Sequence, residues 1–296
     1  MQSEIFEYFL NGGDAQLLVC EDDKEAIAAL SAAEFAGLKV FRLPDFRARE
    51  GDDLRSFSAE LFELSSELAK FYEFEGKKLL ISPVCTVLNK LPGKKHLQKL
   101  TLNFGDKIDP KELAQKLLRF GYEAVDIVES EGEFCVRGEI IDIFSVGGES
   151  AVRILLDGET VESIRRFDVA TQKSEKDELA QVEIAPFLAN LSEDEFESVS
   201  EKISRADSDA LARDLGSLGF WFIEGFVDYT SAFDCILLHE IKKDEIFSER
   251  NLDFLDAIEV LPAARKFKDL AVTPSQEFFE FHRSEAITLI ARNDAL

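Results

Sequence analysis

The apolar periodicity of this 296-residue sequence changes near Gly105 and changes back after Pro186, and this change restricts the possible folds more than any other feature. In residues 1–104, short apolar runs at 16–20, 38–43, 78–84 and 97–104 alternate with amphipathic stretches. The longest stretch, 53–74, has apolar residues at three- and four-residue spacing, which is typical of a helix with one buried stripe. Strands separated by helices predict a parallel α/β layer.

Residues 122–186 lack helical periodicity and are rich in β-branched and aromatic side chains. Glycines interrupt this region at Gly132, Gly147 and Gly158, and Asp157-Gly158 is a two-residue hairpin signal. Helical character returns after Pro186, and further strands are predicted at 220–226, 235–238 and 286–291. We therefore predict a mixed α/β fold. Residues 1–104 and 188–296 are expected to form two parts of one α/β domain, and residues 105–187 an inserted antiparallel β-rich domain.

The composition indicates a globular protein of the cytoplasm. Acidic residues outnumber basic ones by 59 to 34, and the formal charge of −25 repels the phosphate backbone of nucleic acids. The cysteines are widely scattered and lie mostly in apolar runs, as in reduced intracellular proteins. The first ten residues have neither the charge nor the apolar length of a signal peptide or membrane anchor. The sequence thus predicts no membrane partner and no direct binding of nucleic acid.

The sequence contains no recognisable catalytic or nucleotide-binding motif. A phosphate-binding loop needs the pattern G-x-x-x-x-G-K-[ST], but Gly12-Gly13 is followed by Asp14 and Ala15. The three histidines are far apart, and none has the spacing to a cysteine that a zinc site needs. We expect no catalytic residue, no cofactor and no metal. The alternative is an ATP-dependent DNA-acting enzyme whose divergent nucleotide site lies around Gly12 and Glu240.

Two arginines, Arg137 and Arg153, lie on neighbouring predicted strands of the β-rich region. Strand alternation places Arg153 and Leu155 on one sheet face, with their apolar neighbours Val152, Ile154 and Leu156 on the other. In the earlier strand, alternation places Arg137 opposite a set of apolar residues and predicts a bulge at Gly138, where the pattern shifts to Ile141 and Ile143. The apolar residues on that opposite face are Phe134, Val136 and Ile140.

Such a pair of arginines has two interpretations. Arginine is enriched at interface hot spots and forms two-point pairs with carboxylates, so a sheet face with two arginines fits an acidic protein partner. Alternatively, each arginine only balances a nearby acidic residue, such as Glu139 or Glu159. Periodicity alone favours the second interpretation.

A resemblance to a known family changes this balance. The segments 121–123, 132–144, 153–154, 161–168 and 171–172 resemble the inserted domain shared by the bacterial transcription-repair coupling factor (Mfd) family and the excision-repair helicase UvrB. The sequence Glu-Ser-Ile-Arg-Arg-Phe-Asp at 162–168 and the pair Thr171-Gln172 favour the Mfd family. The flanking parts resemble the degenerate RecA-like, helicase-like α/β module at the N-terminus of that family.

The resemblance implies that UvrA is the protein partner, in transcription-coupled nucleotide excision repair. By position, Arg137 and Arg153 correspond to the arginines that contact UvrA, with Leu155 and Asp157 as neighbours. The family commonly has an aromatic residue where this chain has Asp157, so part of the apolar contact is expected to be missing.

Family members also carry a polymerase-binding domain and an ATP-driven DNA translocase that are absent here. The resemblance therefore implies a non-catalytic N-terminal fragment that reaches RNA polymerase and DNA only through those absent parts. A further hypothesis is an autoinhibitory module, which packs on later domains of the full-length protein. Those domains would cover the sheet face that carries Arg137 and Arg153, called the arginine face below.

Overall fold

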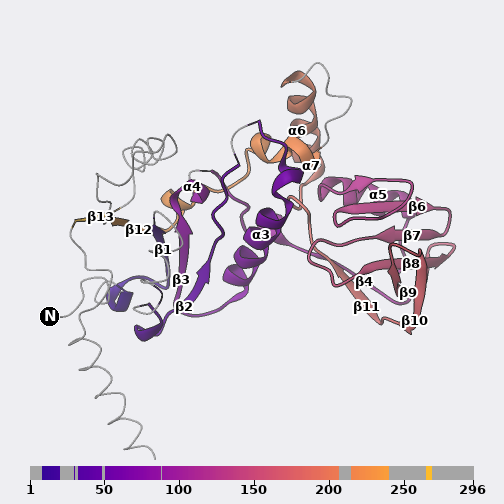
Figure 1. The fold of residues 1–296 in the computed structure, drawn as a ribbon, viewed down its shortest axis with the longest axis horizontal. Coiled ribbons are helices and arrows are strands. Elements are labelled where there is room, and N and C mark those ends of the chain that lie inside the picture. Colours follow the sequence, from indigo (N-terminus) through magenta and orange to yellow (C-terminus); the bar gives the residue numbers. More distant parts are fainter. Residues whose placement is uncertain are drawn as a thin grey trace, which may run out of the picture. The chain divides into compact units, whose positions relative to one another are not determined.

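A computed structural model describes residues 9–20, 30, 33–48, 51–87, 89–206, 215–239 and 265–268 of the chain (Figure 1). The described residues divide into two compact units. Unit 1 consists of those within Met1–Arg47, Lys70–Leu91 and Asp228–Leu296, and unit 2 of those within Ala48–Ala69 and Pro92–Val227. The fold is mixed α/β with both parallel and antiparallel sheets, as predicted. The domain boundaries at 104 and 187 stay a prediction.

Unit 1 contains a five-stranded sheet in the order β13-β12-β1-β3-β2, in which all neighbouring strands are parallel. Five of six residues are buried in both β1 and β3, as expected for parallel strands covered on both faces. The strands predicted at 16–20, 38–43, 78–84 and 235–238 are thereby confirmed, and the one predicted at 286–291 lies outside the described residues. The strands are β1 Ala15–Cys20, β2 Lys39–Arg42, β3 Lys78–Pro83, β12 Asp234–His239 and β13 Arg265–Lys268.

The helix predicted at 53–74 is confirmed as a short 3-10 helix, η1 (Leu54–Phe57), followed by α3 (Ser58–Glu73). Its apolar stripe is buried at Leu61, Leu64, Leu68 and Phe71. Near the end of α3, the Phe71 ring packs edge-on against Phe41 and Phe233, with ring centres 5.7 and 5.5 Å away. Unit 1 also contains the short helices α4 (Val84–Val87) and α8 (Tyr229–Ala232).

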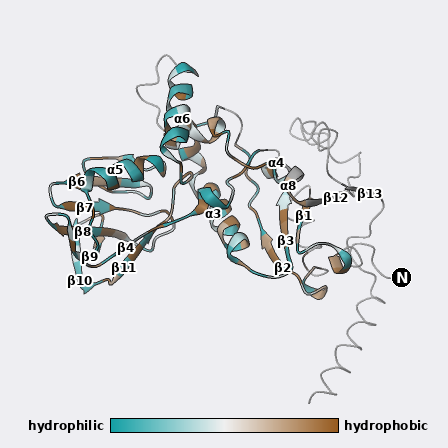
Figure 2. Cartoon of the chain, turned by 180° about the vertical axis from the view of Figure 1, so that it is seen from behind, coloured by the Kyte–Doolittle hydropathy of each residue, from teal (hydrophilic) through white to brown (hydrophobic). Residues whose placement is uncertain are grey.

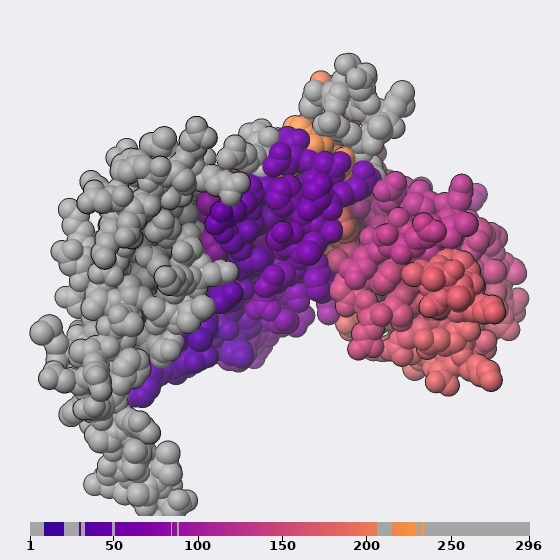
Figure 3. All heavy atoms as spheres, viewed as in Figure 1, coloured from indigo at the N-terminus to yellow at the C-terminus, as the bar shows by residue number. Residues whose placement is uncertain are grey.

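Unit 2 contains a six-stranded sheet in the order β10-β9-β8-β7-β6-β5, which is antiparallel except between β5 and β6. All six residues of the edge strand β10 are exposed, and its segment is seen as salmon spheres in Figure 3. Charged edge strands discourage pairing with other chains. The strands are β5 Glu123–Ala124, β6 Glu133–Arg137, β7 Ile140–Ile143, β8 Ala151–Asp157, β9 Thr160–Asp168 and β10 Lys173–Glu178.

The core of unit 2 contains apolar side chains from one face of this sheet and from the helix α5 (Pro110–Arg119). Asp109 caps α5 by accepting a hydrogen bond from the Lys111 backbone at 2.7 Å, and Pro110 occupies the first turn. In Figure 2, which is coloured by hydropathy, the apolar strand β3 of unit 1 is brown and the hydrophilic strand β10 of unit 2 is teal.

The strand predicted at 97–104 is confirmed but belongs to another sheet, and the strand predicted at 220–226 is wrong. Residues 97–104 do not extend the parallel sheet: β4 (Leu100–Asn103) pairs antiparallel with β11 (Gln181–Ile184) in a separate two-stranded sheet. The apolar run 220–226 is not a strand, because its first part is the 3-10 helix η4 (Gly219–Phe222). A short apolar run suits a buried strand and a buried helical turn equally well, so its length and composition alone do not distinguish the two.

The remaining helices of unit 2 follow the predicted return of helical character. Acidic residues occupy the first turn of α6 (Glu193–Ala206), where they complement the positive end of the helix dipole. The short helices η2 (Lys94–Leu97) and α7 (Leu215–Leu218) complete this part. No helix within the described ranges combines the length and apolarity that crossing a bilayer requires.

Candidate functional site

Two tight hairpins bring the predicted site residues onto one face of the six-stranded sheet. In the first, Arg137 pairs with Ile140 across a two-residue turn at Gly138-Glu139. In the second, Asp157 pairs with Thr160 across Gly158-Glu159. Both glycines have positive φ, 63° and 62°, in the first turn position, as in turns that match the twist of the flanking strands.

The first hairpin corrects one prediction. Gly138 is a turn residue and not a bulge, so Ile140 lies on the same face as Arg137 and not opposite it. The predicted shift of the apolar pattern to Ile141 and Ile143 is confirmed, because both are buried and pair with Val136 and Phe134. Ile140 also pairs with Leu155 of β8, which places the two arginine-bearing strands on either side of β7. The alternation predicted for β8 is confirmed, because Val152, Ile154 and Leu156 are buried and Leu155 is 37% exposed.

Arg137 and Arg153 converge on the carboxylate of Asp142, in β7 between them. Arg137 Nη2 donates to Asp142 Oδ2 at 2.6 Å. Arg153 binds the same carboxylate at two points, from Nε to Oδ1 at 2.7 Å and from Nη2 to Oδ2 at 2.9 Å. The Asp142 side chain is only 1% exposed, so two cations share one buried anion and this group of three residues keeps one net positive charge.

The two arginines differ in exposure and in surroundings. The Arg137 side chain is 48% exposed, whereas that of Arg153 is 21% exposed. Arg153 also donates from Nη1 to the Gln172 carbonyl at 3.1 Å, and its guanidinium carbon lies 4.7 Å from the centre of the Phe167 ring. A guanidinium over an aromatic face is stabilised by the ring quadrupole.

Phe167 belongs to a small cluster with Val128, Cys135 and Ala151, each at most 4% exposed. Burial raises the pKa of the Cys135 thiol. This cluster supports one end of the arginine face, and Cys135 pairs directly with Asp142 across the strands. The apolar support next to the arginines is therefore built by β6, β8 and β9 together.

The other predicted neighbours lie toward the turn end of the face. Leu155 is adjacent to Ile140 in the register, and Asp157 is exposed two residues further along β8. The structure thus brings Arg137, Arg153 and Leu155 together, with Asp157 at the margin. Asp142 and Gln172 were not predicted as site residues. The only sequence signal for Asp142 is an acid inside the apolar run 140–144.

Local charge balance by Glu139 or Glu159 does not describe the arginine pair, since both arginines pair with Asp142. The next arginine on this face, Arg165, is balanced by a different acidic residue, since its Nη2 donates to Glu178 Oε1 at 2.6 Å. Hydrogen bonds from Arg165 and Ser163 hold the pKa of Glu178 below its usual value.

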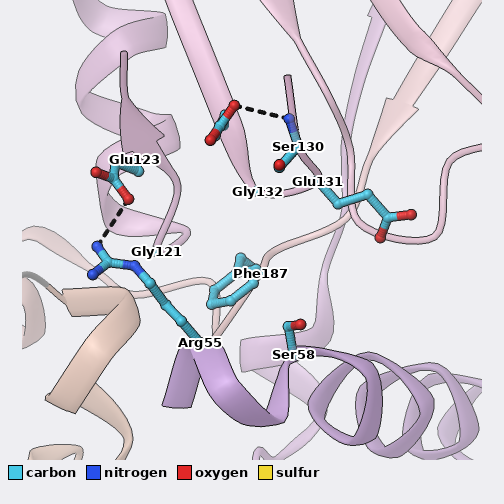
Figure 4. A pocket seen from close by; sticks show the side chains of 9 residues that line it. Arg55, Ser58, Gly121, Glu123, Ser130, Glu131, Gly132 and Phe187 are labelled. Carbon is cyan, nitrogen blue, oxygen red and sulfur yellow. Dashed lines mark hydrogen bonds and ion pairs between the residues drawn. The ribbon is translucent and has the colours of Figure 1, made fainter. Parts of the chain in front are cut away.

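A pocket of about 210 Å³ lies elsewhere in unit 2, near the start of β6. Figure 4 shows the Arg55 and Glu123 side chains pointing toward one another, with their ion pair at 3.0 Å. Glu133 accepts hydrogen bonds from the backbone of Glu129 and Ser130 at 2.8 and 2.9 Å. These charged groups are already paired, and no predicted site residue lines the pocket.

The region of the alternative nucleotide site is only partly described, because Glu240 lies outside the described residues. The buried Gln16 side chain folds back on the Gly12-Gly13 loop, and its Nε2 donates to the Gly13 carbonyl at 3.0 Å. A Cβ built on Gly12 would lie 2.2 Å from Gln16 Nε2, so the space beside this glycine is filled. Across the described ranges, no three His, Cys, Asp or Glu side chains gather closely enough to hold a metal ion.

Comparison with known proteins assigns this sheet to a family. Residues 100–188 match the family described as the UvrB interaction domain. The whole chain aligns with the transcription-repair-coupling factor of Helicobacter pylori (strain ATCC 700392 / 26695), at 32% identity over 308 positions. That relative is much longer, and the chain covers 31% of it.

Shorter stretches match other relatives of the same name. The transcription-repair-coupling factor of Staphylococcus aureus (strain MRSA252) is 44% identical over 86 residues, which is 29% of this chain and 7% of the relative. That of Myxococcus xanthus is 37% identical over 107 residues, which is 36% of this chain and 9% of the relative. Over its whole length the chain is thus similar to part of the transcription-repair-coupling factors (Mfd), and its residues 100–188 match the UvrB interaction domain.

Proposed function

We propose that this chain is a binding module for UvrA in transcription-coupled nucleotide excision repair, and that it binds through the arginine face of the six-stranded sheet. The observation that carries the proposal is the exposed guanidinium of Arg137, held beside Leu155 and Ile140 by the buried Asp142. The match to the UvrB interaction domain and the similarity to transcription-repair-coupling factors support the same partner.

The chemistry of this face favours an acidic partner segment. The chain as a whole has a formal charge of −25, but the Arg137, Arg153 and Asp142 group carries a local excess of positive charge. A local cationic site in an anionic surface disfavours phosphate backbones while it still accepts a single, well-placed carboxylate. The exposed Leu155 adds apolar area next to that charge.

The flanking α/β parts, in this proposal, are a degenerate RecA-like, helicase-like domain without nucleotide hydrolysis. The Gln16 side chain beside Gly12 supports this assignment, because a phosphate-binding loop needs that backbone open to its ligand. ATP-driven movement on DNA and contact with RNA polymerase are proposed to belong to parts of the longer relatives outside this chain.

The proposal is tested by titrating the chain with purified UvrA in a calorimeter. The double variant Arg137→Ala, Arg153→Ala should bind at least about 30-fold more weakly, as expected for loss of a hot-spot residue. The matched control is Arg166→Ala: Arg166 lies on β9, its side chain is 43% exposed, and it points to the opposite face. Wild-type affinity in the double variant, or equal loss in the control, would refute the assignment.

A further inference from the structure

We infer that the two arginines have different tasks: Arg137 contacts the partner, whereas Arg153 acts with Asp142 and Gln172 as a positioning group that holds Arg137 in place. This inference rests on the proposed function and deepens it. It predicts that one guanidinium, and not two, is presented to a carboxylate of UvrA. It also predicts that residues with no partner contact control the affinity.

Arg153 has a hydrogen bond at every nitrogen of its guanidinium. Nε and Nη2 both donate to Asp142, and Nη1 donates to the Gln172 carbonyl and, at 3.5 Å, to Ser174 Oγ. One face of the guanidinium lies over the Phe167 ring. A planar guanidinium with every nitrogen engaged has no edge left for a two-point pair with a partner carboxylate.

Arg137 is hydrogen-bonded at one guanidinium nitrogen alone within the described part of the chain. Its single ion pair in the described part of the chain runs from Nη2 to Asp142 Oδ2, and neither Nε nor Nη1 has a hydrogen-bond partner among the described residues. The side chain is 48% exposed at the end of β6, next to the Gly138 turn. Anchoring one nitrogen restricts the rotamers of a long side chain, and this lowers the entropy lost on binding.

Gln172 supplies the backbone carbonyl that accepts a hydrogen bond from Arg153 Nη1. Gln172 is the only described non-glycine residue with positive φ, at 58°, a conformation that costs free energy and needs support. Its Nε2 donates to the carbonyls of Val169 and Val128, at 2.7 and 3.1 Å. A chain of contacts therefore runs from Val128 through Gln172, Arg153 and Asp142 to Arg137.

The roles are separated by double-mutant cycles, with UvrA binding measured by calorimetry. Arg137→Ala should weaken binding about 30-fold, whereas Asp142→Asn and Arg153→Lys should each weaken it by about tenfold. If these two residues act only through Arg137, their effects should disappear in the Arg137→Ala background. A purely structural role would add the same loss in both backgrounds.

A second measurement covers the case in which Asp142→Asn fails to fold. Gln172→Gly keeps the positive φ but removes the side-chain amide, so it loosens Arg153 without a buried charge left unpaired. In the free chain, the Nε–H resonance of Arg153 should be protected from solvent exchange, and Gln172→Gly should remove that protection and weaken binding severalfold. Unchanged protection and affinity would overturn the inference.

The outcomes keep the two proposals apart. If the wild-type chain does not bind UvrA, the proposed function fails and the cycles cannot be run. If the wild type binds, but Asp142→Asn and Arg153→Lys lose as much affinity in the Arg137→Ala background as in the wild type, the function stands and the positioning role is wrong. If Asp142→Asn and Arg153→Lys lose affinity only in the background that keeps Arg137, the result supports both proposals.

Discussion

Arg153 and Asp142 form a two-point ion pair on paired strands, with both nitrogen–oxygen distances below 3 Å and an aspartate side chain only 1% exposed. Asp142 pairs directly with Arg153 in the β7–β8 register, so the sheet itself sets this geometry. Burying a carboxylate is unfavourable unless charge and hydrogen bonds compensate for the lost water. Asp142 therefore couples the stability of the sheet to the position of both arginines.

Asp142→Ala should lower the free energy of unfolding of unit 2 by about 3 kcal/mol, because it leaves Arg153 without its buried partner. Urea unfolding can be followed by the fluorescence of Trp221, the only tryptophan of the chain, which lies in unit 2. Glu178→Gln, which removes an exposed partner of Arg165, is the matched control and should leave the midpoint unchanged. If both variants shift the urea midpoint equally, the burial of Asp142 does not determine its contribution to stability.

Gly132→Ala should destabilise unit 2 for two reasons that can be separated. Gly132 has φ 84°, and a Cβ there would lie 2.9 Å from the Phe187 ring. Gly158 has φ 62°, but a Cβ there meets nothing within 4 Å. Gly158→Ala should therefore cost only the backbone contribution of about 1 kcal/mol, and Gly132→Ala more. If Trp221 fluorescence shows that both variants lose the same free energy of unfolding, Phe187 moves aside without cost.

Protonation of Glu195 at acidic pH should lower the free energy of unfolding of unit 2. Burial alone would raise the pKa of Glu195, but hydrogen bonds from Lys95, Ser192 and His96 lower it from 4.5 to about 2. A carboxyl with a depressed folded pKa stabilises the protein above its unfolded pKa, and this contribution is lost as the pH falls toward the folded value. The loss should thus occur between about pH 4.5 and 2.

The variant Glu195→Gln tests this titration. It should reduce stability at neutral pH and flatten the decline of the urea midpoint over that acidic range. Glu197→Gln, an exposed residue of the same helix, should keep the wild-type decline. An unchanged pH dependence in Glu195→Gln would assign the acid sensitivity to other groups.

Strand alternation predicted the faces of β8 correctly, since Val152, Ile154 and Leu156 are buried and Leu155 is exposed. It failed for Ile140, because alternation was continued through Gly138, where the chain makes a two-residue turn. A slip of one residue moves every later side chain to the other face, so the turn type had to be known first.

The residues missed by sequence analysis depend on long-range register. Asp142 becomes a site residue only because β7 lies between β6 and β8, and no local pattern shows that it meets Arg153. Gln172 has a positive φ, and its side chain donates to the carbonyl of Val128, 44 residues away in the chain. The run 220–226 was assigned to a strand because short apolar runs do not distinguish strands from helical turns.

The last prediction concerns the apolar half of the proposed UvrA site. Leu155 is 37% exposed beside Ile140, and Asp157 is an exposed acid further along the same strand. Leu155→Ala should weaken UvrA binding about fivefold without a change in stability, because it removes apolar area that binding would bury. Asp157→Phe should strengthen binding, since an aromatic side chain adds contact area and removes a negative charge that opposes an acidic partner. Calorimetric titration of both variants measures these effects, with Glu159→Phe in the adjoining turn as the control for nonspecific stickiness. If Asp157→Phe weakens binding, or if Glu159→Phe strengthens it equally, the partner does not use this edge of the arginine face.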